Sequence, residues 1–318
     1  MPRGMIAYNP IAGRYPSQVL AERAANVLRQ HDWQLTLERT HSGEHIIELA
    51  RQAAAEGLDA IFIAGGDGSL NFAIEGLLGS ETALGVLPSG TANVWAQELG
   101  LPGLSWSRWL ALEESARKLA SASSCRVDVG LCNQHPFLLW AGVGLDAFVV
   151  HRLEPRSRWE RNFAIVNYAA SVAWHASFWK GINLRVVADG QQIEGHFLLA
   201  LVSNVHLYAG GLANLSPDAR LDDGLMDLWL FEGETLGDTV QAAWDLLSGR
   251  HIQSPRVHHM EFSQLAIESE LKTYVQVDGE PREVRDQVTI SILPKALHVL
   301  VPPDTPHTLF GVVRSPET

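Results

Sequence analysis

The stretch Asp59–Asn71 reads DAIFIAGGDGSLN and decides the fold of the first part of the chain. Its first half, Asp59–Ala64, is short and almost wholly apolar, which is typical of a strand buried on both faces. This strand runs directly into Gly65 and Gly66, and residues 69–78 then carry apolar side chains at a helical period. A strand that turns through glycines into a helix predicts one unit of a parallel α/β sheet.

The same alternation of strands and helices continues on both sides of this stretch. Apolar runs and period-two patterns predict strands over Gly4–Tyr8, Trp33–Glu38 and Ala83–Leu87. Helical periods predict helices over Pro16–His31, His45–Ala55, Thr91–Leu99 and Trp106–Leu119. Strands that alternate with helices in this order favour a parallel sheet covered by helices on both faces. We therefore expect residues 1–122 to form a doubly wound α/β domain.

After Ser121 the pattern changes to a succession of strands. We expect them at residues 126–131, 137–143, 182–188, 193–202, 225–231, 256–267, 274–277 and 288–293. Asp189-Gly190 stands between two of these strands as a hairpin signal, and helices are expected near Trp159–Trp179 and Thr235–Leu247. The pattern predicts an antiparallel β-sandwich over residues 123–299, so the fold class is α/β plus mainly-β.

Composition and charge limit the function classes. Hydrophobic residues make up 46% and charged residues 19% of the 318 residues, which is ordinary for a globular protein and excludes a disordered chain. The chain holds 24 Lys and Arg against 36 Asp and Glu, a formal net charge of −12. Because duplex DNA is bound through a broad basic surface, we expect no nucleic-acid partner. A small anionic ligand needs only one local positive site and is not excluded.

The sequence carries no signal for a membrane span, a leader or a disulfide framework. No apolar run approaches the roughly 18 residues that a spanning helix needs, and the N-terminal MPRGMIAYNP has no signal-peptide core. We therefore expect a soluble, cytoplasmic protein. Cys125 and Cys132 are too few for a disulfide framework or a four-ligand zinc site, so we expect two buried thiols.

The glycine-rich turn Gly65–Asn71 carries the first chemical signal. Backbone N–H groups at a helix N-terminus, unobstructed by side chains, form an anion site, and glycines let the chain approach a phosphate closely. Asp67 in the middle of this turn would repel a phosphate unless it serves a metal ion or a proton. The alternative is a structural turn in which Asp67 is the helix N-cap.

Two further turns follow expected strands in the same way. Pro88–Asn93 offers the hydroxyl of Thr91 and the amide of Asn93, which could bind phosphate or ribose, although Thr91 could also be a helix cap. Asn9–Gly13 follows the first strand. All three turns lie at the carboxyl ends of expected parallel strands, the edge at which open α/β sheets bind ligands.

Three familiar nucleotide motifs are excluded. The chain contains no Gly-Lys pair, so it has no Walker A loop. A dinucleotide GxGxxG fingerprint that started at Gly66 would need glycine where Asn71 stands. The His-Arg-Asp and Asp-Phe-Gly signatures of protein kinases are also missing.

The motifs taken in order resemble the diacylglycerol kinase catalytic domain family, and within it the soluble bacterial lipid kinases that are related to sphingosine and ceramide kinases. The first half carries Asn9-Pro10-x-x-Gly13, Gly65-Gly66-Asp67-Gly68-Ser69-x-Asn71 and Pro88-x-Gly90-Thr91-x-Asn93. The second half adds Asp128-Val-Gly130, Gly142-Val-Gly144-Leu-Asp146-Ala147, Asn204, Tyr208-Ala-Gly210-Gly211, Asp222-Asp223-Gly224-Leu225 and Asp278-Gly279-Glu280. The likeness spans about residues 5 to 300.

The resemblance implies an ATP-dependent kinase that phosphorylates a lipid hydroxyl. It implies an N-terminal nucleotide-binding domain, a C-terminal lipid-substrate sandwich, and a tail of about residues 300–318 that packs back on the first domain. Nucleotide contacts carry over onto Asn9, Pro10, Ile11, Ala12, Gly13, Thr40, Gly65, Gly66, Asp67, Gly68, Ser69, Leu70, Asn71 and Thr91. The family usually has threonine where Ser69 stands, which we expect to tune the nucleotide site without abolishing activity.

The resemblance also implies a magnesium site and a general base. The metal site carries over onto Asp223 with the backbone oxygens of Arg220 and Leu225, which is oxygen ligation of the kind that Mg²⁺ prefers. The base is expected at Glu280, with Asp278 second, and Asp67 could hold the catalytic magnesium or activate the hydroxyl. Each of these segments could instead be an ordinary turn, so the structural alternative stays open.

A local basic segment points to a membrane surface. Residues 151–161 carry four Arg against two Glu and include Trp159, in a chain of net charge −12. A basic, Trp-bearing entrance to an amphipathic helix suits an anionic bilayer, so we expect peripheral association with the inner membrane face. A solvated loop is the alternative, and a homodimer is left open.

Two competing functions stay open at this stage. An NAD-kinase-like enzyme also uses a Gly-Gly-Asp-Gly turn, although the Pro88–Asn93 turn and the Asp222-Asp223 pair favour a lipid kinase. A non-catalytic sensor of lipid or nucleotide on the same fold should have lost Asp67 or the carboxylates of residues 278–280, and these are present.

Overall fold

The computed structural model describes residues 1–10, 17–104, 108–153 and 179–311. Two compact units divide the chain: Met1–Val129 together with the residues from Pro294 on, and Gly130–Leu293. The divisions fall within β5 (Ser123–Cys132) and β15 (Glu280–Val301), so these two strands connect the units. The boundary expected after residue 122 lies at the start of β5, and the one expected after residue 299 lies near the end of β15.

The first unit is built on a parallel sheet. Its strands are β1 (Arg3–Tyr8), β2 (Gln34–Arg39), β3 (Ala60–Gly65) and β4 (Ala83–Pro88), in the order β2-β1-β3-β4. The C-terminal part of β15 adds a further parallel strand beside β4, with Val299 opposite Leu84. β3 and β4 are buried along their whole length, as the apolar run in the sequence predicts.

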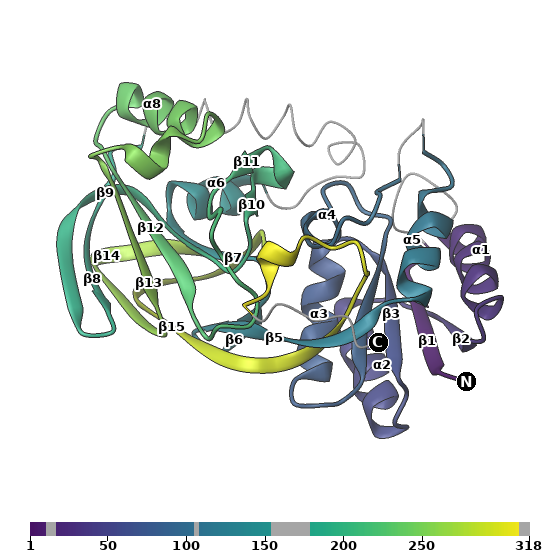
Figure 1. The fold of residues 1–318 in the computed structure, drawn as a ribbon. Coiled ribbons are helices and arrows are strands. Elements are labelled where there is room, and N and C mark those ends of the chain that lie inside the picture. The colour runs from purple at the N-terminus through teal and green to yellow at the C-terminus, as the bar shows by residue number, and fades with distance from the viewer. Residues whose placement is uncertain (11–16, 105–107, 154–178, 312–318) are drawn as a thin grey trace. The chain divides into compact units, whose positions relative to one another are not determined.

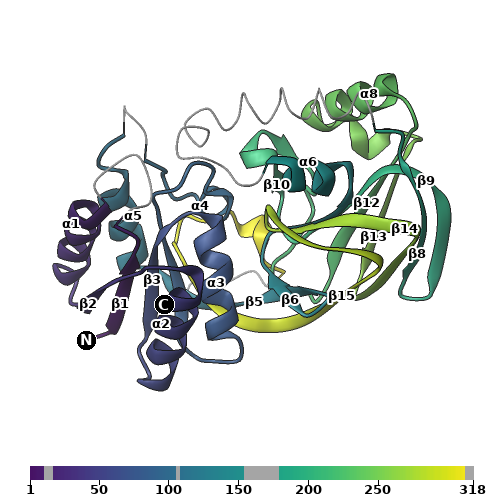
Figure 2. The same cartoon turned by 180° about the vertical axis from the view of Figure 1, so that it is seen from behind.

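Helices cover both faces of this sheet. α1 (Ser17–Arg29) packs with α5 (Ala111–Ala120), and α2 (Gly43–Ala55) packs with α3 (Asp67–Leu77). The two pairs lie on opposite faces of the strands (Figures 1 and 2). The short helix α4 (Val94–Glu98) follows β4. The doubly wound α/β prediction for the first part of the chain is confirmed.

Several helix starts differ from the sequence prediction: α5, expected from Trp106, begins at Ala111, and α3, expected from Ser69, begins at Asp67. The helix expected from Thr91 begins at Val94, because Asn93 takes a left-handed conformation with φ of 53°. The helix expected from His45 begins two residues earlier at Gly43, because the Ser42 side chain accepts the N–H of His45 and caps the first turn.

The second unit is an antiparallel sandwich, as predicted. Its strands run in the order β13-β12-β9-β7-β14-β15, with β8 paired to both β9 and β14. The bounds are β6 His135–Phe137, β7 Trp140–Gly144, β8 Ile182–Ala188, β9 Gln191–Ser203, β12 Met226–Glu232, β13 Val257–Phe262 and β14 Gln264–Val277. A short pair, β10 (Leu207–Tyr208) with β11 (Ala213–Asn214), forms a separate two-stranded sheet.

The long strands β9 and β14 change partners along their length. The first part of β9 pairs with β8 over Gln191–Phe197, and the second part pairs with β7 over Leu199–Ser203. β14 likewise pairs with β8 near its start and with β7 near its end. The strands thereby enclose one apolar core, whose fully buried side chains include Phe137, Phe197 and Phe262.

Two strands that the sequence predicts as continuous are each broken. The strand expected over 137–143 is interrupted between β6 and β7, where main-chain N–H groups turn to a distant carboxylate. The strand expected over 256–267 is interrupted at Ser263, whose N–H and hydroxyl both donate to the Asp189 carboxylate. In both cases a side chain far away in the sequence takes N–H groups that a strand would need for its ladder.

The helices of the second unit are α6 (Leu145–Leu153) and α8 (Leu236–Leu247), with short 3-10 helices at Ala209–Gly211 and Arg250–Gln253. α8 matches the helix expected over 235–247, and α6 was not expected. The helix expected near Trp159–Trp179 falls on residues that lie almost wholly outside the described ones. No helix in the described part of the chain is both long and apolar enough to cross a membrane.

Both cysteines of the chain are buried. Burial raises the pKa of the Cys132 thiol to about 12, against the opposing effect of Arg282 and Arg285. A thiol with so high a pKa is a poor nucleophile at neutral pH. These residues therefore act as small core side chains, as expected.

The contact between α2 and α3 depends on Gly76. A Cβ at this position would stand 2.6 Å from the Cβ of Ala50 and 2.6 Å from the carbonyl oxygen of Ile47. Gly76→Ala should therefore lower the free energy of unfolding by about 1–3 kcal/mol through overpacking, measured by denaturant titration. Gly237→Ala in α8 is the matched control, because its Cβ would meet only the Thr235 hydroxyl at 3.6 Å. That control should leave stability unchanged or raise it by up to about 1 kcal/mol, and equal effects of the two changes would contradict the close approach.

Candidate functional site

The three glycine-containing turns of the first unit begin at adjacent strand ends. In the parallel register Tyr8 lies opposite Ala64, and Gly65 lies opposite Pro88. The N–H of Ser89 donates to the carbonyl of Gly65 at 3.1 Å, which extends the ladder to the start of the third turn. The turns after β1, β3 and β4 therefore start side by side at the carboxyl edge of the sheet.

Gly66 and Gly90 bring two of these turns into main-chain contact. A Cβ added to Gly90 would stand 2.6 Å from the Cα of Gly66 and 2.7 Å from Oδ1 of Asn93. A Cβ added to Gly66 would stand 3.3 Å from the Cα of Gly90. Glycine is therefore required at Gly90 by a close approach of backbones, and any larger residue at Gly66 would push the two turns apart.

The carboxylate of Asp67 joins the same two turns. Its Oδ2 accepts the N–H of Val94 at 2.9 Å, and its Oδ1 accepts the N–H of Trp95 at 3.1 Å. These are N–H groups of the first turn of α4, so Asp67 supplies the cap that the N-cap residue Asn93 does not give. Burial raises the pKa of the Asp67 carboxyl above its usual value, although the hydrogen bonds from Val94 and Trp95 act to lower it.

The structure gives the Asn93 amide a role within its own turn, and its predicted binding of phosphate or ribose stays a prediction. Its Oδ1 accepts the N–H of Gly90 at 3.0 Å, and its Nδ2 donates to the carbonyl of Gly90 at 2.9 Å. Asn93 is buried and closes its own turn. Thr91, in contrast, is exposed, so its hydroxyl can reach a ligand.

The N-terminus of α3 has the features of an anion site. Its N-cap is Gly66, which has no side chain to accept the N–H groups of the first helical turn. Ser69 is half-buried over Gly65, where a Cβ would stand 2.8 Å from the serine hydroxyl oxygen. A phosphate could therefore approach the main chain of residues 65–68 without meeting a bulky side chain.

Three other residues predicted to contact the nucleotide have buried side chains. The N–H of Thr40 donates to the carbonyl of Tyr8 at 2.9 Å, which places the end of β2 beside the first turn, but the Thr40 side chain is buried. Leu70 and Asn71 also have buried side chains. The Leu70 side chain is part of the core and not of the turn surface.

The first turn is described only at its beginning. The carbonyl of Asn9 accepts the hydroxyl of Ser17 at 2.7 Å, and Pro10 is half-buried. Ile11, Ala12 and Gly13 lie outside the described residues.

In the second unit, Asp278 organises the turn that precedes Glu280. Asp278 has a left-handed backbone with φ of 48°, and its carboxylate accepts the N–H groups of Leu138, Leu139 and Trp140, each at 3.0 Å. These are the N–H groups that interrupt the strand predicted over 137–143. The structure thus gives Asp278 a role in holding the main chain, and its role as a base stays a prediction.

Gln276 ties the same turn to α6, and sequence reasoning missed it. Its Nε2 donates to Oδ2 of Asp146 at 2.8 Å, and its Oε1 accepts the N–H of Gly279 at 2.8 Å. Gln276 is buried within β14, where it reads as an ordinary strand residue, so no local signal could have revealed it. Glu280 follows this turn directly and is half-buried.

Asp128 performs a similar function in the first unit. Its side chain is fully buried, and its Oδ1 accepts the N–H of Lys295 at 2.7 Å. Lys295 has φ of 51°, so the carboxylate stabilises an irregular position within β15. The structure thus gives Asp128 the role of satisfying a backbone N–H group.

The predicted metal ligands lie in one turn of the second unit. Oδ1 of Asp223 accepts the N–H of Leu225 at 3.0 Å. Asp223 and Arg220 are exposed, and Leu225 is half-buried. No group of three or more His, Cys, Asp or Glu that could hold a metal occurs in the described part of the chain. The donor set of one carboxylate and two carbonyl oxygens fits Mg²⁺, which keeps waters or phosphate oxygens in the rest of its shell.

In the comparison with known proteins, each half of this chain matches the model of a different domain. Residues 3–132 match the family described as the diacylglycerol kinase catalytic domain, and residues 140–301 match the YegS C-terminal NAD kinase beta sandwich-like domain. The chain belongs to the family of bacterial lipid kinases that combine these two domains.

The similar proteins cover nearly the full length of the chain. A protein of Chromohalobacter salexigens named "Probable lipid kinase YegS-like" is 30% identical over 88% of this chain and 88% of its own length. A diacylglycerol kinase of Bacillus subtilis is 26% identical over 88% of this chain and 90% of its own length. A crystal structure of a diacylglycerol kinase from Bacillus anthracis shares the fold, with a TM-score of 0.74 and 22% identity over 95% of this chain and 97% of that one.

The double hydrogen bond of Asp67 can be tested by one substitution. In Asp67→Asn the amide NH₂ must face one of the two N–H groups, which leaves a buried donor without a partner. We expect a loss of about 1–3 kcal/mol in the free energy of unfolding, measured by thermal and denaturant melts. Asp32→Asn is the control, because Asp32 is exposed and asparagine tolerates its left-handed backbone. An equal free energy of unfolding in Asp67→Asn and Asp32→Asn would show that the Asp67 cap does not stabilise the fold.

Proposed function

We propose that this kinase transfers the γ-phosphoryl group of ATP, with Mg²⁺, to the hydroxyl of a diacylglycerol-like lipid. The observation that carries the proposal is the pair of glycine turns at Gly66 and Gly90, in main-chain contact at the N-terminus of α3. Such an arrangement suits a polyphosphate, since it offers N–H groups and leaves no room for side chains. The names of the similar proteins support a lipid as acceptor.

The first unit binds the nucleotide in this proposal. The main chain of residues 65–68 receives phosphate oxygens, and the exposed Thr91 hydroxyl donates a further hydrogen bond. Asp67 holds the two turns together through Val94 and Trp95, and thereby fixes the position of the N–H groups. Phosphoryl transfer is governed mainly by such positioning and by charge neutralisation.

Asp223, with the carbonyl oxygens of Arg220 and Leu225, would hold a magnesium ion. When bound, Mg²⁺ would neutralise charge on phosphate oxygens. The Asp223 carboxylate is already oriented by the N–H of Leu225, which lowers the entropy lost when a cation is bound.

Glu280 is the proposed general base. A lipid hydroxyl is a weak nucleophile, so a carboxylate within hydrogen-bond reach assists by taking its proton. The turn before Glu280 is fixed from two sides, by the three N–H groups bound to Asp278 and by the Gln276 link to Gly279. We therefore assign positioning to Asp278 and proton transfer to Glu280.

An anionic membrane surface is the proposed place of action. Arg152 is exposed at the end of α6, with its guanidinium 5.2 Å from the ring centroid of Phe148. The remaining residues of the basic segment, including Arg156, Arg158, Trp159 and Arg161, lie outside the described residues. Their part in membrane attraction rests on sequence alone.

Transfer of radiolabelled phosphate from ATP to a panel of acceptors tests the function. The panel holds diacylglycerol, phosphatidylglycerol, a sphingoid base and a polyprenol in mixed micelles, with NAD as a soluble acceptor, each with and without Mg²⁺. We expect Mg²⁺-dependent labelling of diacylglycerol and none of NAD. Labelling of NAD alone would favour the NAD-kinase-like alternative, and no labelling of any acceptor would favour a non-catalytic sensor.

Three variants distinguish proton transfer by Glu280 from the structural role of Asp278. Glu280→Gln should lower kcat by about 10²–10⁴-fold while the KM for ATP and the melting temperature stay unchanged. Asp278→Asn should instead lower the free energy of unfolding by more than about 2 kcal/mol, because buried N–H groups lose a charged acceptor. Glu283→Gln is the control, since Glu283 is exposed in β15 and pairs only with Arg285 in the described residues. Wild-type turnover in Glu280→Gln would move the base to another carboxylate.

A further inference from the structure

The outer face of α8 is apolar. Leu236, Val240, Trp244 and Leu247 recur at intervals of four, four and three residues, which places them on one side of the helix. Val240 and Trp244 are each 61% exposed and Leu247 is 56% exposed. Ile252, in the 3-10 helix that follows, is also exposed. We call these five residues the α8 stripe.

The α8 stripe is not needed to attach the helix to its own unit. The opposite side of α8 already carries Ala242 and Leu246, which pack against the buried cluster that contains Trp229 and Phe231. A surface helix normally has one apolar face toward the core and one polar face toward water. α8 has two apolar faces, and only one of them is covered within the described structure.

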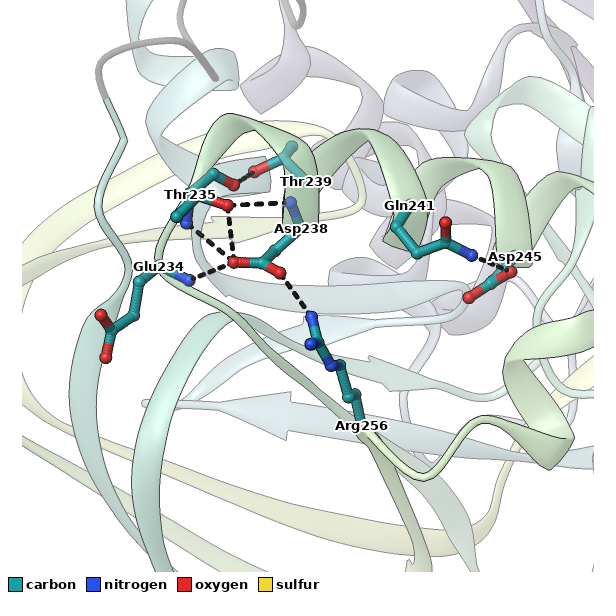
Figure 3. A network of polar contacts seen from close by, with 7 residues as sticks. All are labelled: Glu234, Thr235, Asp238, Thr239, Gln241, Asp245 and Arg256. Carbon is teal, nitrogen blue, oxygen red and sulfur yellow. Dashed lines mark hydrogen bonds and ion pairs between the residues drawn. The ribbon is translucent and has the colours of Figure 1, made fainter.

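The acidic side chains of α8 are withdrawn from the stripe. Figure 3 shows that Asp238 faces the start of the helix, where it accepts the N–H groups of Glu234 and Thr235 and pairs with Arg256. Asp245 is buried and accepts a hydrogen bond from Gln241 at 2.9 Å. Neither carboxylate therefore interrupts the apolar surface, and the Asp238 charge is paired with Arg256.

The local charge differs from that of the chain. Residues 235–256 contain Asp238 and Asp245 against Arg250 and Arg256, so their formal charge is zero, whereas the whole chain carries −12. Arg250 is exposed at the end of α8 nearest to Ile252. An anionic surface therefore repels the chain as a whole but does not repel this segment.

We propose that the α8 stripe docks on the surface of a lipid bilayer, with the helix lying in the interface. Leucine, valine and isoleucine side chains enter the acyl boundary, Trp244 lies at the headgroup level that tryptophan favours, and Arg250 meets anionic headgroups. The α8 stripe shares no residue with the basic segment at 151–161. The choice of a bilayer over other apolar surfaces rests on the proposed lipid acceptor, which resides in one.

Vesicle co-sedimentation without ATP or acceptor tests the docking directly. The probes are vesicles of phosphatidylcholine alone and of phosphatidylcholine with an equal amount of phosphatidylglycerol. Val240→Asp combined with Trp244→Asp should lower the partition coefficient on the mixed vesicles at least about tenfold. Val19→Asp is the matched control, because Val19 is an apolar residue of helix α1, outside the stripe, and is 50% exposed. It should bind as the wild type does.

A second variant works in the opposite direction. Ala243 is exposed beside the stripe on α8, so Ala243→Leu adds apolar surface without removing any contact. It should raise the partition coefficient several-fold, and this result decides the matter if the double Asp variant does not fold. Binding of the double Asp variant equal to wild type, or no change in Ala243→Leu, overturns the proposal.

Two other occupants of the stripe give distinct results. A wild-type dimer in light scattering that becomes monomeric in the double Asp variant would make the stripe an interface between copies of this chain. A lower melting temperature of that variant, with no vesicle binding by the wild type, would mean that the chain itself covers the stripe. Either result overturns bilayer docking. Kinase activity on a short-chain, soluble acceptor is measured separately, so failure of docking and failure of the proposed function are distinguishable.

Discussion

The main-chain contact between the turns at Gly66 and Gly90 is the constraint on which the site of the first unit depends. These two turns come this close because Gly90 has no Cβ, which would stand 2.6 Å from the Cα of Gly66. Once they touch, the carboxylate of Asp67 spans from one turn to the start of α4 and holds both. The order of strand, glycine turn and helix thus produces a surface of N–H groups with no bulky side chain in front of it.

Carboxylates that fix the main chain recur throughout the molecule. Asp67 caps α4, Asp278 takes three N–H groups between β6 and β7, Asp128 holds Lys295, and Asp189 takes Ser263. A charged acceptor binds N–H more strongly than a neutral one, so each carboxylate can stabilise an irregular main chain that a strand or helix would not allow. Several acidic residues of the family motifs therefore stabilise the main chain of the fold, whether or not they also contact a ligand.

Local patterns in the sequence were enough for the layers of the fold but not for its irregular positions. The buried strands β3 and β4 and the helices around them follow from apolar runs and helical periods. The break after Phe137 could not be read locally, because it depends on Asp278, which lies far away in the sequence. The left-handed Asn93 and the Gln276 link likewise depend on partners that only the folded chain brings together. Residue type and order were sufficient to place the glycine turns, whereas the roles of the carboxylates required the hydrogen-bond partners.

The return of the C-terminal segment to the first unit has a consequence for synthesis and for fragments of the protein. Val299 pairs with Leu84, the Thr305 hydroxyl bonds to Leu99, and Lys118 pairs with Asp304, so residues after Pro294 complete a unit that begins at Met1. During translation the sandwich can fold as soon as residue 293 has left the ribosome, while the sheet that starts the chain still waits for its last strand. A fragment that ends near residue 130 would expose the edge of β4, where that strand normally lies. Expression of the first unit alone therefore calls for a direct link from the end of β5 to the last part of β15, not for a simple truncation.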